Sequence, residues 1–178
     1  MSIRKVYGVG INDSGYNIQK KGKGYICPYY LKWRNMLQRC YSQNSYKGCV
    51  VCEEWKIFSM FKKWAVLQSV PPESMNNYHL DKDLLGRGSK IYSPDTCCFL
   101  SPLLNTFMTN CIGGNPLKGT TVKKSNGLIF AQVKNPLLNK TEYLGVCSTR
   151  EEGHTLWLRR KKEILEEVID LEDDLEEK

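Results

Sequence analysis

The sequence predicts an α+β protein built from two parts, and three observations point to this class. Two segments of the first half, residues 29–41 and 53–68, place large apolar side chains at helical spacing. A stretch rich in Gly, Pro and Asn at about 112–119 then interrupts the pattern. Beyond this break, three short β-type runs precede one long helix.

These observations divide the chain into expected regions. We expect a first part over residues 1–111, consisting of an N-terminal arm, two helices and a small sheet-and-helix module. The second part is expected over residues 119–170, as a small three-stranded sheet with a long helix, followed by an acidic tail at 171–178. Hydrophobic residues make up 41% of the chain, which is enough for real cores.

The first part begins with a segment, residues 5–27, whose Gly and Asn-Asp-Ser-Gly content predicts a short hairpin or an extended arm. Two helices follow, and the side chains expected to face the core are Tyr30, Trp33, Leu37 and Tyr41 in the first, and Trp55, Phe58, Phe61 and Ala65 in the second. Lys62 and Lys63 should face outward. The pair Pro71-Pro72 ends the second helix, because proline cannot continue it.

The second part shows a change of period. Residues 119–125, 128–136 and 140–147 read as strands, and Asn126-Gly127 between the first two predicts a tight hairpin turn. A helix should then start after Ser148 or Thr149 as N-cap, with Glu151 and Glu152 in its first turn.

Charge is distributed unevenly along the chain. The net charge is +7, but residues 166–178 carry eight acidic residues and one lysine. The preceding 165 residues therefore hold 25 basic against 11 acidic residues, a balance of +14. A body this basic favours a polyanionic partner such as nucleic acid. The acidic tail is interpreted as the solvated end of the helix.

Two other properties bear on the compartment. No run of about 18 apolar residues is present, and residues 1–13 lack the apolar region of a secretory signal, so we expect a cytoplasmic protein without a membrane span. The eight cysteines should then be reduced. Cys49-Val-Val-Cys52 has the spacing of half a zinc knuckle, but it lacks a second half, and Val50 and Val51 favour a buried strand. Structural zinc is therefore the less favoured interpretation, and small core residues the favoured one.

Residues 78–105, YHLDKDLLGRGSKIYSPDTCCFLSPLLN, contain an acidic strand end, a Gly-containing loop, a Tyr-Ser-Pro turn and a helix start with an asparagine. Together with residues 33–42 and 46–64, this segment resembles phage-encoded HNH-type (His-Me finger) homing endonucleases. With the second part included, the resemblance covers most of the chain from about residue 29.

The resemblance implies an HNH-like ββα-metal module that makes metal-dependent phosphodiester cuts or nicks in double-stranded DNA. By position, Asp81 and Asn105 would hold a Mg²⁺ or Mn²⁺ ion, and both ions prefer oxygen ligands of this kind. Lys82 stands where the family has its general-base histidine. Asp83 would be a second acid or a structural hydrogen-bond partner.

Lys82 departs from the family pattern. A lysine is normally protonated at neutral pH and cannot accept a proton, although burial near other cations would lower its pKa. The carboxylates of Asp81 and Asp83 would raise that pKa instead. His79 lies two residues before Asp81, on the same strand face, and is a second candidate base. A salt-bridged turn with a purely structural role is the alternative for residues 81–83.

The second part resembles the AP2 DNA-binding domain, through its three strands and a helix that begins Ser-Thr-Arg-Glu-Glu. The resemblance implies that the exposed sheet face contacts the major groove, where lysines reach phosphates without reading sequence. The residues expected to contact DNA are Arg87 and Lys90 on the loop of the first part, and Lys123, Lys124, Gln132, Lys134 and Lys140 in the second, with Tyr143 as a further candidate.

Three functions stay open at this point. The first is a DNA-binding HNH-like endonuclease or nickase. The second is a catalytically inactive phage factor that keeps the nuclease fold and binds DNA or protein. The third is an inhibitor of a host enzyme, in which the acidic tail mimics nucleic acid. Double-stranded DNA is the expected partner in the first two, and a host protein in the third.

Overall fold

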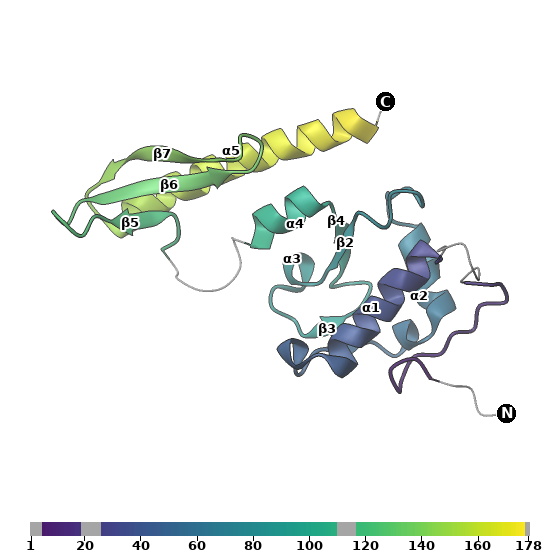
Figure 1. Ribbon diagram of the computed structural model, residues 1–178. Coiled ribbons are helices and arrows are strands. Elements are labelled where there is room, and N and C mark those ends of the chain that lie inside the picture. Colours follow the sequence, from purple (N-terminus) through teal and green to yellow (C-terminus); the bar gives the residue numbers. More distant parts are fainter. Residues whose placement is uncertain (1–4, 19–25, 110–116, 177–178) are drawn as a thin grey trace. The chain divides into compact units, whose positions relative to one another are not determined.

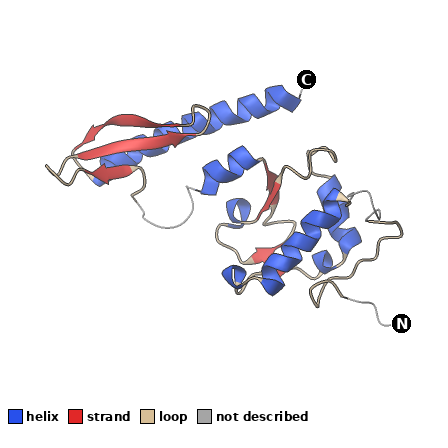
Figure 2. Cartoon of the chain, in the orientation of Figure 1, coloured by secondary structure: helices blue, strands red, loops and turns tan. Residues whose placement is uncertain are grey.

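A computed structural model of the protein describes residues 5–18, 26–109 and 117–176, and it has an α+β architecture (Figures 1 and 2). The chain divides into two compact units, residues 1–105 and 106–178. The expected break at 112–119 falls mostly outside the described residues. Within the described ranges, no helix is both long enough and apolar enough to cross a membrane.

The first unit combines helices with two small sheets. Its elements in chain order are α1 (Pro28–Ser42), η1 (Asn44–Tyr46), β1 (Val50–Val51), η2 (Glu54–Lys56), α2 (Phe58–Val66), β2 (His79–Asp81), α3 (Asp83–Gly86), β3 (Ile91–Tyr92), β4 (Cys98–Leu100) and the start of α4 (Pro102–Thr109). Strand β1 pairs with β3 in parallel, and β2 pairs with β4 antiparallel. The strand expected at the paired valines is present, but only Val51 is buried, whereas Val50 is exposed.

An aromatic core holds α1 and α2 together. The predicted inward residues Trp33, Trp55, Phe58 and Phe61 are each at most 1% exposed. The indole N–H of Trp33 donates to the backbone oxygen of Trp55 at 2.6 Å, so the polar atom of this buried ring is satisfied. Tyr30 and Tyr41, also expected to face the core, are only partly buried at its edge.

The second helix is shorter than its apolar pattern predicts. The pattern predicts a single helix over 53–68, whereas a 3-10 turn ends at Lys56 and α2 begins at Phe58. Ile57 between them is extended, and it pairs with Ile11 of the N-terminal arm. The N–H of Ile11 donates to Lys56 O at 2.8 Å, and the N–H of Phe58 donates to Ile11 O at 3.0 Å. Pairing with a distant segment therefore overrides local helix propensity here.

The second unit contains the predicted three strands and long helix. They are β5 (Thr120–Val122), β6 (Ile129–Asn135), β7 (Lys140–Cys147) and α5 (Arg150–Glu176), with an antiparallel sheet in the order β5-β6-β7. Gly127 has a φ of +71° in the β5–β6 turn, as the Asn-Gly signal predicts. Thr149 is the cap of α5, because its Oγ1 accepts the N–H of Glu152 at 3.1 Å.

The sheet of this unit has two different faces. Ala131, Val133 and Asn135 of β6 are buried on the side where α5 packs, and α5 buries Trp157 and Ile164. The intervening residues of β6 lie on the opposite face, which is the alternation that the sequence predicts.

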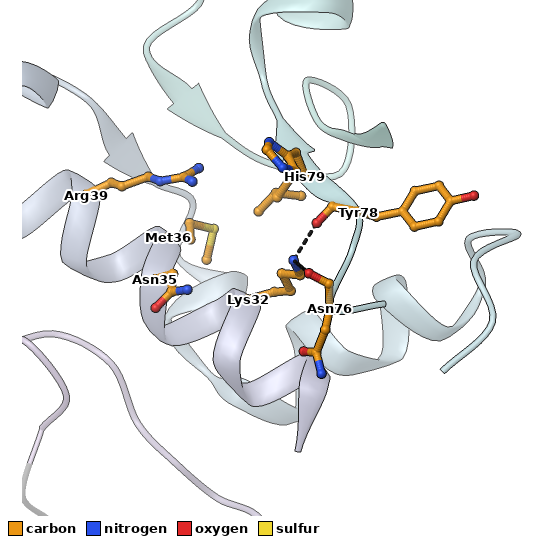
Figure 3. Close-up of a pocket in the computed structure, with 8 residues that line it drawn as sticks. Lys32, Asn35, Met36, Arg39, Asn76, Tyr78 and His79 are labelled. Atoms are coloured by element: carbon orange, nitrogen blue, oxygen red, sulfur yellow. Dashed lines mark hydrogen bonds between the residues drawn. The ribbon is translucent and has the colours of Figure 1, made fainter. Parts of the chain in front are cut away.

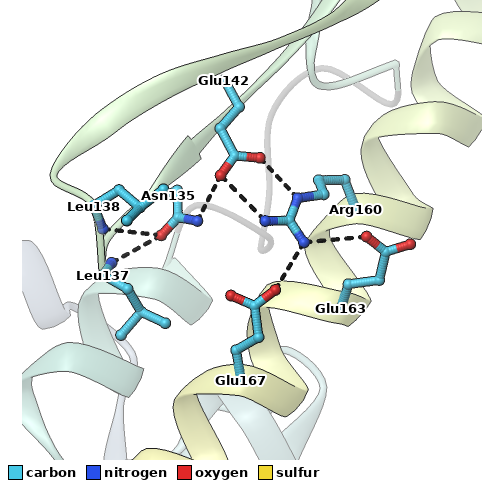
Figure 4. Close-up of polar contacts among 7 residues, drawn as sticks. All are labelled: Asn135, Leu137, Leu138, Glu142, Arg160, Glu163 and Glu167. Atoms are coloured by element: carbon cyan, nitrogen blue, oxygen red, sulfur yellow. Dashed lines mark hydrogen bonds and ion pairs between the residues drawn. The ribbon is translucent and has the colours of Figure 1, made fainter.

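An ion-pair network joins the sheet to the helix (Figure 4). The guanidinium of Arg160 donates to both carboxylate oxygens of Glu142, at 2.7 and 3.2 Å, and Asn135 donates to the same carboxylate at 2.6 Å. Arg160 also pairs with Glu163 and Glu167 on α5, at 3.1 and 2.9 Å. Hydrogen bonds from Arg160 and Asn135 hold the pKa of Glu142 below its usual value.

At Gly119, which precedes β5, the backbone lies very close to Trp157 of α5. Its φ is +80°, and an added Cβ would lie 2.1 Å from Trp157 Cγ. Gly127 has a similar φ of +71° but nothing within 4 Å of such an atom. We expect Gly127→Ala to cost about 1–2 kcal/mol from the left-handed backbone alone. Gly119→Ala should cost about 1–3 kcal/mol more, because the chain must also shift away from Trp157.

Urea denaturation followed by circular dichroism measures both changes in the free energy of unfolding. Equal losses in the two variants would contradict the tight packing of Gly119 on Trp157.

Candidate active site

The candidate site is built on β2, β4 and α4. His79 faces Leu100 and Asp81 faces Cys98 in the antiparallel register. Leu80 is only 6% exposed, so the strand turns it into the core and places His79 and Asp81 on the other face. Ser101 Oγ accepts the N–H of Leu104 at 3.1 Å and starts α4 directly after β4. Two antiparallel strands are thus followed at once by a helix.

His79 and Asn105 are in direct contact. The side-chain nitrogen Nδ2 of Asn105 lies 3.1 Å from His79 Nδ1, which brings together two predicted site residues from β2 and α4. The histidine ring stays accessible to solvent. Its partial burial and the positive charges of Lys32 and Arg39 lower its pKa from 6.5. His79 is therefore neutral at pH 7, as a proton acceptor must be.

The side chain of Asp81 stabilises the start of the short helix α3. Its Oδ1 accepts the backbone N–H of Asp83 at 3.0 Å and of Leu84 at 2.8 Å. This carboxylate oxygen satisfies donors that would otherwise lack partners at the helix start. The contact uses Oδ1 and not Oδ2, so the second oxygen can serve a ligand without loss of the cap.

The surroundings of Lys82 do not suit a general base. The residue is 8% exposed, and its Nζ lies 2.5 Å from Asp83 Oδ1 and 5.9 Å from the centre of the Tyr92 ring. Burial lowers the pKa of Lys82, but the hydrogen bond to Asp83 and the charge of that carboxylate outweigh it and raise the pKa above the usual value. Lys82 therefore keeps its proton at neutral pH. Of the two candidate bases, the electrostatics favour His79.

The two residues predicted to hold a metal ion both carry oxygen atoms. Asp81 has carboxylate oxygens and Asn105 an amide oxygen, and the contact with His79 uses the amide nitrogen of Asn105. Oxygen donors completed by water are what Mg²⁺ and Mn²⁺ accept. In the part of the chain that the structure describes, no group of three or more His, Cys, Asp or Glu side chains could hold a metal. There, every cysteine is a free thiol, with Cys49 buried and Cys52 partly buried.

The residues predicted to contact DNA fall in both units, and most are exposed. Arg87 has a left-handed φ of +46° at the end of α3, and it is exposed, as is Lys90. In the second unit, the exposed residues are Lys123 and Lys124 in the β5–β6 connection, Lys134 on β6, and Lys140 and Tyr143 on β7. Gln132 is partly buried and donates to Thr121 Oγ1 at 3.1 Å.

Sequence reasoning missed two cations beside His79. Lys32 and Arg39 of α1 line the same small pocket as His79 (Figure 3). Lys32, Asn35 and Arg39 recur at spacings of three and four residues, so they form a polar stripe on the side of α1 opposite Trp33. That stripe was visible in the sequence, but its position next to the distant β2 was not.

In comparisons with known proteins, no family model, no curated protein and no solved structure matches this chain. The functional evidence therefore lies in the side chains themselves. Two features of the site bear on its chemistry. The first is the contact of His79 with Asn105, with Asp81 on the same strand face as His79. The second is the pair of cations Lys32 and Arg39, which line a pocket with His79.

The pKa of His79 can be measured directly. Titration of its ring protons by NMR should give a value below 6.5, and Arg39→Gln should raise it by removing a positive charge. Since the unfolded chain binds this proton more tightly, the stability that His79 contributes is complete above pH 6.5. It should be lost as the pH falls through the folded-state pKa.

His79→Gln should reduce this part of the pH dependence of unfolding. A His79 pKa at or above 6.5 would contradict the electrostatic description of the site.

Proposed function

We propose that the chain is a DNA-binding HNH-like endonuclease that makes metal-dependent phosphodiester cuts or nicks in double-stranded DNA. The observation that carries this proposal is the arrangement of three predicted site residues. His79 and Asp81 share one face of β2, and Asn105 of α4 contacts His79 at 3.1 Å. A hairpin-like strand pair followed by a helix is also what the resemblance to the His-Me finger family implies.

In this proposal each side chain has one task. Asp81 and Asn105 hold a Mg²⁺ or Mn²⁺ ion through their oxygens, and the bound ion supplies positive charge for the leaving oxygen and the developing phosphorane. Neutral His79 takes the proton from the attacking water on Nδ1. The amide nitrogen of Asn105 donates to this nitrogen in the free site, so the water replaces that contact when Asn105 turns its oxygen to the ion. Lys82 is not the base, because its pairing with Asp83 keeps it protonated. It anchors the strand end instead.

The second unit would deliver the nuclease to DNA in the manner of an AP2-like domain. The face of its sheet opposite α5 carries Phe130, Gln132 and Lys134 of β6 and the exposed ring of Tyr143 on β7. Glu142, the acidic residue of β7, is paired with Arg160 of α5. Its negative charge is thus neutralised, and the lysines of the sheet can meet phosphates with less repulsion.

A second candidate is a catalytically inactive factor that keeps the same fold as a binding platform. It is favoured by the structural use of residues 81–83, since Asp81 Oδ1 caps α3 and Lys82 is buried against Asp83. In that case Asp81 would matter for stability and not for chemistry. The two candidates differ in whether removing the charge of Asp81 changes anything besides folding.

Asp81→Asn separates these roles, because the amide oxygen can still accept the two N–H groups of α3. With supercoiled plasmid and Mg²⁺ or Mn²⁺, we expect metal-dependent nicking by the unmodified chain and its loss in Asp81→Asn and Asn105→Ala. His79→Ala should slow it by about 10²–10⁴-fold, as loss of a general base does. Asp95→Asn, at an exposed carboxylate outside the site, should cut at an unchanged rate.

Intact plasmid with every metal, together with clear retardation of DNA on a gel, would support the inactive platform and refute the endonuclease.

Phosphate binding by the sheet can be measured from the salt dependence of DNA affinity. Removing a lysine that neutralises one phosphate should reduce the slope of log K against log salt by about 0.9. We therefore expect a smaller slope in Lys134→Gln and in Lys140→Gln. Lys162→Gln, at a highly exposed lysine of α5, is the matched control and should leave the slope unchanged. Equal slopes in all three variants would argue against the sheet as the DNA-binding surface.

A further inference from the structure

A small polar pocket lies between α1 and β2, next to the candidate active site (Figure 3). Its volume is about 120 Å³. The polar residues that line it are Lys32, Asn35, Arg39, Asn76 and His79, with Met36 and Leu80 as apolar neighbours and Tyr78 at the strand entry. No carboxylate is among these lining residues.

Lys32 is held in place by the backbone. Its ammonium donates to the backbone oxygens of Asn76, at 3.1 Å, and of Tyr78. These two acceptors carry partial charge only, so they orient the ammonium without neutralising it. The ammonium of Lys32 is also partly removed from water. This burial lowers the pKa of Lys32 most, and the positive charge of Arg39 lowers it further.

Arg39 supplies the second cation. Its guanidinium extends from α1 toward His79 in Figure 3. It lies 5.8 Å from the centre of the Tyr46 ring and shares a hydrogen bond with the side chain of Tyr92. Within the described residues, neither Lys32 nor Arg39 forms an ion pair with a carboxylate.

Two cations share this pocket with no carboxylate in its lining, which makes the electrostatic potential there positive. Their mutual repulsion costs free energy in the empty pocket, and a bound anion would relieve it. A guanidinium matches the oxygens of a phosphate in pairs, and a lysine adds a point charge. The amides of Asn35 and Asn76 can donate to further oxygens.

We propose that this pocket binds a phosphate group, with Lys32 and Arg39 as its cationic contacts and His79 at its edge. A phosphate of the DNA backbone is the source that follows from the proposed function, on which this assignment rests. Held there, one phosphate positions the strand, so that a neighbouring phosphodiester lies at His79, Asp81 and Asn105. Lys32 and Arg39 are then substrate-binding residues on α1, outside the motif of residues 78–105.

Phosphate binding should be measurable without any cleavage. A bound phosphate should shift the backbone amide NMR signals of Lys32, Asn35 and Arg39, which line the pocket. The amide signals of α2 around Lys63 are an internal reference, because Lys63 does not line this pocket. NMR titrations of the full chain without metal would use inorganic phosphate, thymidine 5′-monophosphate and a short DNA duplex without terminal phosphates.

We expect each probe to shift the amide signals of the pocket residues until they saturate, and to leave those around Lys63 unchanged. Arg39→Gln should weaken binding about tenfold or more, as loss of a charge-assisted hydrogen bond does. Lys63→Gln removes the same charge from an exposed position on α2 and should stay within about twofold of the unmodified chain. Asn35→Asp, which adds a carboxylate to the pocket lining, should weaken binding at least as much as Arg39→Gln.

The outcomes separate this proposal from the nuclease. No response of the pocket amides to any probe, or equal binding in Arg39→Gln and Lys63→Gln, would overturn the phosphate site even if plasmid is cut. A response that depends on Arg39 would support the site even if plasmid stays intact, and then only the nuclease fails. Binding of the monophosphate as tight as that of the duplex would overturn the DNA backbone as the source.

Discussion

The burial of Trp33 is the constraint on which the candidate site depends. This indole is fully buried, and its N–H is tied to the backbone of Trp55 at 2.6 Å, so α1 has one orientation relative to the segment before α2. With Trp33 facing the core, the opposite stripe of α1 faces β2. Lys32 then donates a hydrogen bond to the backbone that leads into β2, and Arg39 extends toward His79 in the pocket that both line. A truncation at Trp33 would therefore damage the pocket as well as the core.

Electrostatics gives neighbouring titratable groups opposite protonation states. Lys82 and His79 lie three positions apart in sequence, yet a carboxylate beside Lys82 stabilises its charged form. Partial burial and the charges of Lys32 and Arg39 instead stabilise the neutral form of His79. Catalytic sites that separate acids from bases show this pattern. The imidazole of His79 lies on the same strand face as Asp81, two residues earlier.

The second unit uses its charges differently. Arg160 forms ion pairs with three carboxylates, so a network joins β7 and α5. A single exposed ion pair would contribute little to stability. The close packing of Gly119 on Trp157 holds the β5 edge of the same sheet against α5. With one face held by α5, the opposite face keeps its lysines and Tyr143 exposed, and that face is the one proposed to meet DNA.

Local sequence patterns were sufficient to predict the features that depend on near neighbours: the α+β class, the Asn126-Gly127 turn, the Thr149 cap and the aromatic stripes of the helices. In each, residues a few positions apart set the backbone or the buried face. The start of α2 depends on a tertiary contact, because Ile57 pairs with the distant arm. The same holds for the contact of Asn105 with His79 and for the pocket that Arg39 and His79 line together. Contacts between residues far apart in the chain depend on how the core packs, and no local pattern encodes that.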